Sequence, residues 1–277
     1  MSMIVLLTND DGIHAEGLAA LRREFEAAGA DTYVIAPDQE RSACGHAITT
    51  LQPLSVQPMT FPNGSSGGPA AAGGGRSGGP AVRYWACSGT PADCTKIGLR
   101  VLVPSRPDIV VSGINRGPNL GTDVLYSGTV SAAAEAVILG VPGLAISLAA
   151  FENLDYSYAA KVAVHLAREV VERPLPENTL LNVNVPAIGA RDIAGLIVTK
   201  LGIRKWEDIF DKRVDPRGKE YYWLGGGPLQ DDHEEPDTDV AALKQNLISV
   251  TPVHLDLTNH QILADVRNRG LVPPTLD

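Results

Sequence analysis

Apolar runs and helical patterns alternate from the start of the chain. Residues 4–8 are apolar on both faces, as in a strand buried within a parallel sheet. Apolar residues then recur at helical spacing, at Leu18, Leu21, Phe25 and Ala28. Gly29 ends this pattern, and residues 32–36 form a second apolar run. The order predicts a strand, a helix and a parallel strand.

The same alternation continues to residue 185. Further strands are expected at residues 82–87, 108–113, 144–147 and 180–185. Helices are expected at residues 91–102, 129–139 and 156–171. Thr90 and Asp93 form a capping-box pattern, with Pro91 at the first helical position. We therefore predict an α/β fold with a doubly wound, mostly parallel, Rossmann-like sheet and a site at the carboxyl ends of its strands.

The pattern changes after residue 197. Residues 206–214 and 220–224 flank the turn sequence Asp-Pro-Arg-Gly at 215–218, which predicts a long β-hairpin. Thr238 can cap a short helix, and residues 247–253 have the pattern of a late strand. We predict an α/β core at 1–196 and a C-terminal hairpin and tail at 197–277, which forms part of the core.

Residues 64–79 are of low complexity, with eight glycines among 16 positions. They contain no large apolar residue that could offset the entropy of ordering, so residues 58–81 are expected to form a mobile loop. One G-x-G-x-x-G match, from Gly73 to Gly78, has no strand directly before it and no helix after it. It is rejected as a nucleotide-binding fingerprint.

Composition limits the possible partners. The 277 residues are 44% hydrophobic and 20% charged, as in a globular protein. With 23 basic and 32 acidic residues, the formal charge is 23 − 32 = −9. This acidic balance argues against nucleic-acid polymers, which require a basic surface. A small phosphate compound held by a metal ion remains compatible with it.

Membrane and secreted locations are not expected. The longest apolar stretch, residues 136–151, is interrupted by Gly140, Pro142 and Gly143 and is too short for a membrane span. The first residues lack the basic region of a signal peptide. The cysteines number only three, without metal-binding spacing, which argues against a disulfide framework and favours the cytoplasm.

Asp10 and Asp11 directly follow the first predicted strand. Two adjacent carboxylates in a desolvated cleft repel each other, so one must take up a proton or a cation must bind. Carboxylate oxygens are suitable ligands for Mg²⁺, Mn²⁺ or Ca²⁺. The alternative is a helix cap beside a solvated turn residue, with Gly12 supplying the turn.

A second polar segment, residues 37–46, follows the second strand, so it can face Asp10. Ser42 offers a neutral oxygen ligand, and Arg41 and His46 could contact a phosphate or a leaving group. The alternative is an ordinary polar loop.

A third segment, residues 112–121, contains Asn115 and Asn119, whose amides can bind a metal ion or a phosphate. Residues 127–129, which are Ser127, Gly128 and Thr129, then open a helix whose free N–H groups and dipole favour an anion. A long surface loop with a plain N-cap is the alternative. Three polar, glycine-bearing loops after three strands are hard to explain by packing alone.

Together these motifs resemble the SurE family, the stationary-phase survival proteins. The resemblance extends from about residue 4 to residue 258 and is carried by motifs in one fixed order. The matching segments are residues 7–13, 36–38, 40–43, 89–94, 112–119, 127–130, 182–186 and 249–252. The stretch at 58–81 is longer and richer in glycine than the family norm.

The resemblance implies a 5′/3′-nucleotidase, a phosphatase that acts on nucleoside monophosphates with one Mg²⁺ or Mn²⁺ per subunit. It carries the metal ligands onto Asp10, Asp11, Ser42 and Asn115. It carries phosphate contacts onto Asn119, Ser127, Gly128 and Thr129. Asn9, Arg41 and His46 are further candidates for substrate contact. The resemblance also implies a homodimer or homotetramer, here formed through the C-terminal hairpin.

For the reaction, we expect a water molecule oriented by Asp10 or Asp11 to attack the phosphorus atom. Direct attack by Asp10 is the rival, but it often uses Asp-x-Asp spacing, whereas these two residues are adjacent. Short polyphosphate is a possible additional substrate. A non-catalytic nucleotide or metal sensor on the same fold, and a sugar-nucleotide transferase, remain alternatives.

Overall fold

The computed structural model describes residues 2–59, 83–227, 229 and 235–273. Nine strands form one sheet in the order β3-β4-β2-β1-β5-β6-β7-β11-β8, and β9 and β10 pair separately. The strands of the sheet are β1 (Ile4–Thr8), β2 (Asp31–Pro37), β3 (Val56–Pro58), β4 (Arg83–Cys87), β5 (Ile109–Arg116), β6 (Gly143–Ala149), β7 (Thr179–Pro186), β8 (Gly195–Val198) and β11 (Leu247–His254). The separate pair is β9 (Ile209–Val214) and β10 (Glu220–Gly225).

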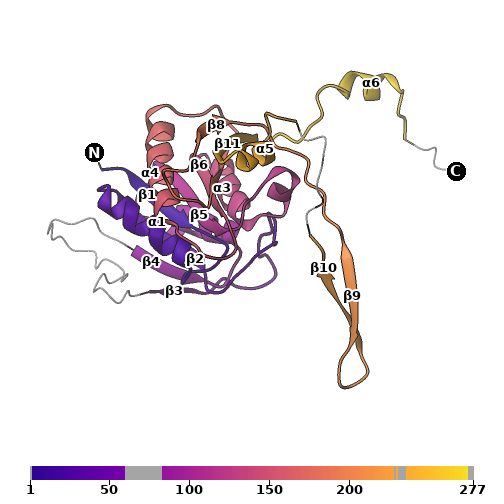
Figure 1. Cartoon of the computed structure of the whole chain (residues 1–277), viewed down its shortest axis with the longest axis horizontal. Coiled ribbons are helices and arrows are strands. Elements are labelled where there is room, and N and C mark those ends of the chain that lie inside the picture. The colour runs from indigo at the N-terminus through magenta and orange to yellow at the C-terminus, as the bar shows by residue number, and fades with distance from the viewer. Residues whose placement is uncertain (1, 60–82, 228, 230–234, 274–277) are drawn as a thin grey trace.

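Helices cover both faces of the sheet (Figure 1). They are α1 (Glu16–Ala27), α2 (Pro91–Ile97), α3 (Gly128–Ile138), α4 (Ser157–Glu172), α5 (Asp239–Lys244) and α6 (Leu263–Asn268), with a π-helical turn η1 (Gly98–Leu102) and a 3₁₀ turn η2 (Gly121–Leu125). Helices α1 and α4 pack together on one face, while α2 and α3 pack together on the other. The predicted doubly wound α/β fold is confirmed.

The centre of the sheet lies at β1 and β5. β1 pairs in parallel with both β2 and β5, and the chain runs outward from this point in opposite directions along the sheet. Such a reversal of strand order opens a crevice at the carboxyl ends of the strands. β3 and β11 are antiparallel to their neighbours β4 and β7, and β8, which is parallel to β11, shares its reversed direction.

Local signals predicted most elements well. The capping box of Thr90 and Asp93 is formed, and the expected helix over 91–102 is α2 followed by η1. The elements β3, β8, η2 and α6 were missed. Each has at most six residues, which is too short a window for hydrophobic periodicity to identify it.

The hairpin β9–β10 projects away from the sheet (Figure 1), and all of its strand residues are exposed. β8 spans residues 195–198, across the predicted boundary at 196, and it joins the main sheet beside β11. The division into a core and a C-terminal part stays a prediction.

Most of the glycine-rich stretch predicted as a mobile loop lies outside the described residues. Among the helices that are described, none has the length and hydrophobicity needed to span a membrane.

Candidate active site at the carboxyl end of β1

Asn9 shapes the turn that follows β1. Its side-chain oxygen accepts a hydrogen bond from the Gly12 N–H at 3.2 Å, and its amide nitrogen donates to the Gly12 carbonyl at 3.0 Å. Gly12 has a φ of +99°, which a glycine adopts without steric cost. The buried Asn9 amide therefore holds the backbone that carries Asp10 and Asp11, hereafter the Asp pair. The predicted contact of Asn9 with substrate stays a prediction.

Asp10 is buried beneath the start of α3. Its Oδ1 accepts a hydrogen bond of 2.5 Å from the Thr129 hydroxyl, and the Thr129 N–H also donates to this carboxylate. A Cβ on Gly128 would lie 2.8 Å from the Asp10 Cβ, so only glycine permits this approach. Burial raises the pKa of Asp10 to about 6, assisted by the charge of Asp11 and opposed by the bonds from Thr129.

Asp11 is less deeply buried than Asp10. Its Oδ2 accepts a hydrogen bond of 3.1 Å from the backbone N–H of Arg116, the last residue of β5. Burial raises the pKa of Asp11, and the hydrogen bond and charge of Arg116 oppose this rise. The site thus places two carboxylates where ionisation is costly without a cation.

Residues 38–50, hereafter the Ser42 loop, are attached directly to the Asp pair. The Arg41 N–H donates to the Asp10 carbonyl at 2.8 Å, and the Arg41 guanidinium donates to the Ser88 carbonyl at 2.9 Å. The exposed Ser42 hydroxyl donates to Glu40 Oε1 at 2.7 Å. Since that bond uses the hydroxyl proton, the Ser42 oxygen keeps lone pairs for another partner.

Asn115 lies at a distortion in β5. The pairing of β5 with β6 shifts register between Ser112 and Asn115, and Gly113 there has a φ of +140°. The Asn115 amide nitrogen donates to the Gly117 carbonyl at 2.8 Å, which leaves the amide oxygen as the group able to bind a cation.

Asn119 belongs to residues 117–127, hereafter the Asn119 loop. Its N–H donates to Asn184 Oδ1 at 2.8 Å, and its side-chain amide donates to the Ser147 hydroxyl at 2.9 Å. Its carbonyl accepts hydrogen bonds from the amides of Asn182 and Asn184. Buried polar side chains from β6 and β7 therefore fix the loop. The predicted phosphate contact of Asn119 stays a prediction.

Ser127 begins α3 as a helix cap. Its hydroxyl accepts a hydrogen bond of 3.1 Å from the Val130 N–H. Gly128 and Thr129 follow, and their N–H groups belong to the helix end that attracts anions. The Thr129 hydroxyl and N–H are directed to Asp10, so Thr129 supports the carboxylate itself. Phosphate binding by residues 127–129 stays a prediction.

His46 lies on the side of the Ser42 loop that faces α3. Its Nε2 is 2.9 Å from Oε2 of Glu135, whose carboxylate is buried and also accepts a hydrogen bond from Lys96. These contacts hold the loop against α2 and α3. A substrate contact by His46 stays a prediction.

The predicted metal ligands have a chemistry that suits Mg²⁺ or Mn²⁺, since all four offer oxygen. The neighbours of Ser42 and Asn115 along the chain, Arg41 and Arg116, each bond to the Asp pair. No cluster of three His, Cys, Asp or Glu side chains with metal-binding geometry occurs in the described ranges. A cation here would therefore depend on hydroxyl and amide oxygens beside the two carboxylates.

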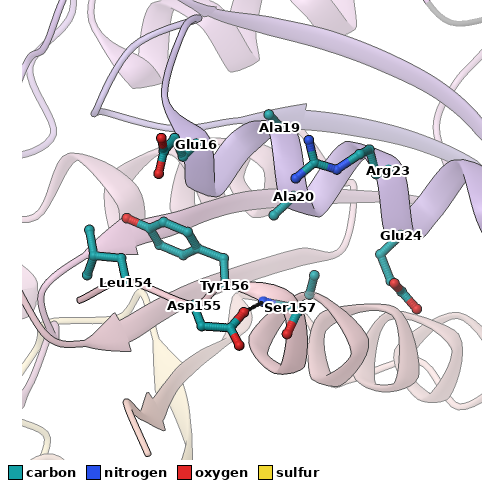
Figure 2. Close-up of a pocket in the computed structure, with 10 residues that line it drawn as sticks. Glu16, Ala19, Ala20, Arg23, Glu24, Leu154, Asp155, Tyr156 and Ser157 are labelled. Carbon is teal, nitrogen blue, oxygen red and sulfur yellow. Dashed lines mark hydrogen bonds between the residues drawn. The ribbon is translucent and has the colours of Figure 1, made fainter. Parts of the chain in front are cut away.

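A groove of about 420 Å³ lies outside this site, between α1 and α4 (Figure 2). None of the four predicted metal ligands lines it. Tyr156, one of its lining residues, is buried, and burial together with the charge of Asp11 raises the pKa of Tyr156 to about 12. The Tyr156 hydroxyl therefore stays protonated at neutral pH.

Several residues that shape the site carried no assignment from the sequence. They are Glu40, Asp123, Glu135, Ser147, Asn182, Asn184 and Asp239. A signal existed for Asn182 and Asn184, since two amides alternate with apolar residues in a strand predicted to be buried. Glu40 bonds to Ser42, two residues away, and the others are recognisable only through partners distant in sequence.

Comparison with known proteins shows the family to which the chain belongs. A family described as "Survival protein SurE" matches residues 5–208. A protein of Heliobacterium modesticaldum named "5'-nucleotidase SurE" is 50% identical over 264 residues, which cover 95% of this chain and 90% of the relative. A protein of Pelotomaculum thermopropionicum with the same name is 48% identical over 261 residues, or 94% and 93% of the two chains.

A solved structure, the SurE protein of Aquifex aeolicus, has a similar fold. It superimposes with a TM-score of 0.77 at 37% sequence identity. The match covers 97% of this chain and 100% of the Aquifex chain.

Proposed function

The chain belongs to the SurE family of survival proteins, and from this premise we propose that it is a metal-dependent nucleotidase. Its substrates would be nucleoside 5′- and 3′-monophosphates, and its products a nucleoside and phosphate. One observation carries the proposal most: the Asp pair lies at the switch point of the sheet, with Thr129 and Arg116 fixing one oxygen of each carboxylate. Relatives named 5′-nucleotidases support the substrate class.

In this proposal Asp10, Asp11, Ser42 and Asn115 hold one Mg²⁺ or Mn²⁺. A divalent cation bound there supplies charge neutralisation for the phosphoryl oxygens and makes water more acidic. Phosphate monoesters hydrolyse very slowly in water, so positioning and charge stabilisation must supply most of the acceleration.

The protein groups divide the remaining work. Asp11, the more accessible carboxylate, orients the attacking water and accepts its proton. The N–H groups of Ser127 and Gly128 and the second N–H of the Asn119 side-chain amide hold phosphoryl oxygens, while Thr129 keeps its bonds to Asp10. Arg41 and His46 lie on the loop that faces the leaving group. Water adds to phosphorus as the bond to the nucleoside oxygen breaks, and that oxygen takes up a proton.

The rival nucleophile is Asp10. Asp10 is buried, and its carboxylate accepts two hydrogen bonds from Thr129 at the start of α3. These features favour a role in holding the site in place rather than in attacking phosphorus. Acid quenching during turnover, followed by mass spectrometry, distinguishes the two. We expect no phosphorylated Asp10, and trapping of an aspartyl phosphate would establish the rival.

A phosphate-release panel tests the substrate class. It contains nucleoside 5′- and 3′-monophosphates, short polyphosphate and sugar phosphates, each with Mn²⁺ or with EDTA. The proposal predicts metal-dependent release from the nucleotides. Nucleotide binding without release would indicate the non-catalytic sensor, and release only with an added acceptor would indicate a transferase.

Assembly is a separate part of the proposal. The hairpin exposes large apolar side chains that a lone chain would leave in water, at Ile209, Phe210, Val214, Tyr221, Tyr222, Trp223 and Leu224. Exposed apolar patches of this kind mark interaction sites, so we propose a homodimer or homotetramer formed through the hairpin. All three cysteines are unpaired, which supports a cytoplasmic location.

A further inference from the structure

The chain enters the hairpin through residues 199–208, and this segment lies against the Asn119 loop. Buried Asp239 joins the two: its Oδ2 accepts a hydrogen bond from Gly121 N–H at 2.8 Å, and its Oδ1 accepts one from Gly202 N–H at 2.9 Å. A Cβ on Gly121 would lie 2.5 Å from the Gly202 carbonyl oxygen. The two backbones are therefore in direct contact.

A second set of bonds lies one or two residues further along each segment. The Thr122 hydroxyl donates to the Arg204 carbonyl at 2.6 Å and accepts from the Arg204 N–H at 3.2 Å. The Asp123 carboxylate accepts from the Arg204 guanidinium at 2.6 Å and from Trp206 Nε1 at 2.7 Å. We call the set of Asp123, Arg204 and Trp206 the Asp123 clasp.

The ion pair of the clasp is well protected for a contact at the base of an exposed hairpin. The side chains of Asp123 and Arg204 are only 14% and 17% exposed, so their ion pair is less screened than a surface pair. The Arg204 guanidinium also lies 5.0 Å from the centre of the Trp206 ring, within the range of a cation–π contact. The Asp123 carboxylate thus holds both the Arg204 guanidinium and the Trp206 ring in place before the hairpin.

The other end of the Asn119 loop reaches the Asp pair. The Tyr126 N–H donates to the Asp123 carbonyl at 3.0 Å, and the Tyr126 carbonyl accepts from Gly45 in the Ser42 loop at 2.9 Å. The next residue, Ser127, caps α3, and Thr129 bonds to Asp10. A continuous path of short contacts therefore links the hairpin base to the carboxylates.

We propose that Asp123 is a positioning residue through which the base of the hairpin sets the geometry of the phosphate-binding end of the site. Loss of the clasp lets residues 121–127 shift, and the start of α3 loses its alignment over Asp10. The inference rests on the proposed nucleotidase function. It adds that the position of the hairpin base affects the affinity for substrate. A partner that binds the hairpin would therefore also change this affinity.

Steady-state kinetics test this with Asp123→Ala and Trp206→Phe, the second of which removes the N–H donor while keeping a smaller aromatic ring. We expect the KM for a nucleoside monophosphate and the inhibition constant of inorganic phosphate to rise together by about tenfold, with kcat changed less than about threefold. Lys212→Ala is the matched control, because it removes a 2.6 Å ion pair to Glu220 within the hairpin without touching the loop. Equal KM values in all variants, or a loss confined to kcat, would overturn the proposal.

Hydrogen exchange provides a second readout that requires no turnover. In Asp123→Ala and Trp206→Phe, amide exchange should rise at residues 126–130 as well as at 121–125, while Lys212→Ala leaves both unchanged. Faster exchange that stops at residue 125 would overturn the coupling. Wild-type protein that releases no phosphate would instead refute the nucleotidase proposal, while the exchange result would still decide the coupling.

Discussion

Two regions of this chain reverse the usual distribution of polar and apolar residues. Beneath the Asn119 loop, Ser147, Asn182 and Asn184 are fully buried within the sheet, where apolar residues are the norm. On the hairpin, Phe210 and Trp223 are more than half exposed. In the first region every named side chain bonds to the loop that borders the Asp pair, whereas in the second the apolar groups meet only water in the single chain.

The difference shows two ways in which a sequence departs from what stability alone would favour. Buried amides cost free energy unless they are hydrogen-bonded, so their presence indicates a backbone that must be held in one place. Exposed aromatic residues lower solubility unless a partner covers them. We therefore read the first region as built for the site and the second as built for assembly.

The largest expected effect is the loss of a carboxylate from the Asp pair, which borders the first region. Asp10→Asn keeps the shape of the side chain but removes its charge, and kcat for p-nitrophenyl phosphate should fall by about 10³-fold or more. Asp108→Asn, at the opposite end of the sheet, is the control and should keep full activity. Full activity of Asp10→Asn would show that this carboxylate is not part of the active site.

A smaller loss is expected when the support of that carboxylate is removed. Thr129→Val keeps the volume but lacks the hydroxyl that donates to Asp10, and kcat should fall by about 10- to 100-fold. Thr129→Ser, which keeps a hydroxyl, should recover most of the activity. Equal losses in both variants would show that the methyl group, and not the hydrogen bond, matters.

Substitutions on the hairpin should affect assembly rather than catalysis. Phe210→Asp and Trp223→Asp place charges on the apolar surface, and the dissociation constant of the oligomer should rise by about tenfold or more in analytical ultracentrifugation. The thermal midpoint of the dissociated chain should hardly change, because both side chains are exposed within it. Val101→Asp, also exposed but on the main body, is the control. Unchanged sedimentation of the hairpin variants would contradict assembly through this surface.

The smallest effect concerns stability near the site. Burial acts to raise the pKa of Asp93, but hydrogen bonds from Thr49 and Thr90 outweigh it and hold this pKa below its ordinary value of 3.8. The ionised form therefore stabilises the fold above that pH, and this stability is lost as the pH falls through the lowered pKa.

Asp93→Asn should accordingly lower the free energy of unfolding by about 1–2 kcal/mol at pH 7, and by less as the pH falls below 4. Urea unfolding at a series of pH values measures this. Glu152→Gln, an exposed carboxylate elsewhere, should show no such trend. If the difference in free energy of unfolding between the wild type and Asp93→Asn grew toward acid pH, the prediction would be contradicted.

The strands at the centre of the sheet and the Asp pair were predictable from the sequence, whereas the buried polar side chains of the first region were not. Apolar periodicity located β1, β2 and β5, and the Asp pair followed from its place after a buried strand. The hairpin followed from its turn sequence. These features depend on residues within a few positions of one another, which is the range over which patterns carry information.

The contacts that complete the site were not predictable in this way. The bond from Thr129 to Asp10 joins residues 119 positions apart, and the bond from Gly121 to Asp239 joins residues 118 apart. Sequence alone assigned Thr129 to phosphate because its place at a helix start is a local signal. Its contact with Asp10 depends on how α3 packs over β1, a tertiary feature that no local pattern encodes.

The most direct test of the central claim is phosphate release from adenosine 5′-monophosphate by protein stripped of metal with EDTA. The account predicts that the stripped protein is inactive, that excess Mn²⁺ restores the wild type, and that Mn²⁺ does not restore Asp10→Asn. Full activity of the stripped wild type, or metal-restored activity of Asp10→Asn, would contradict it.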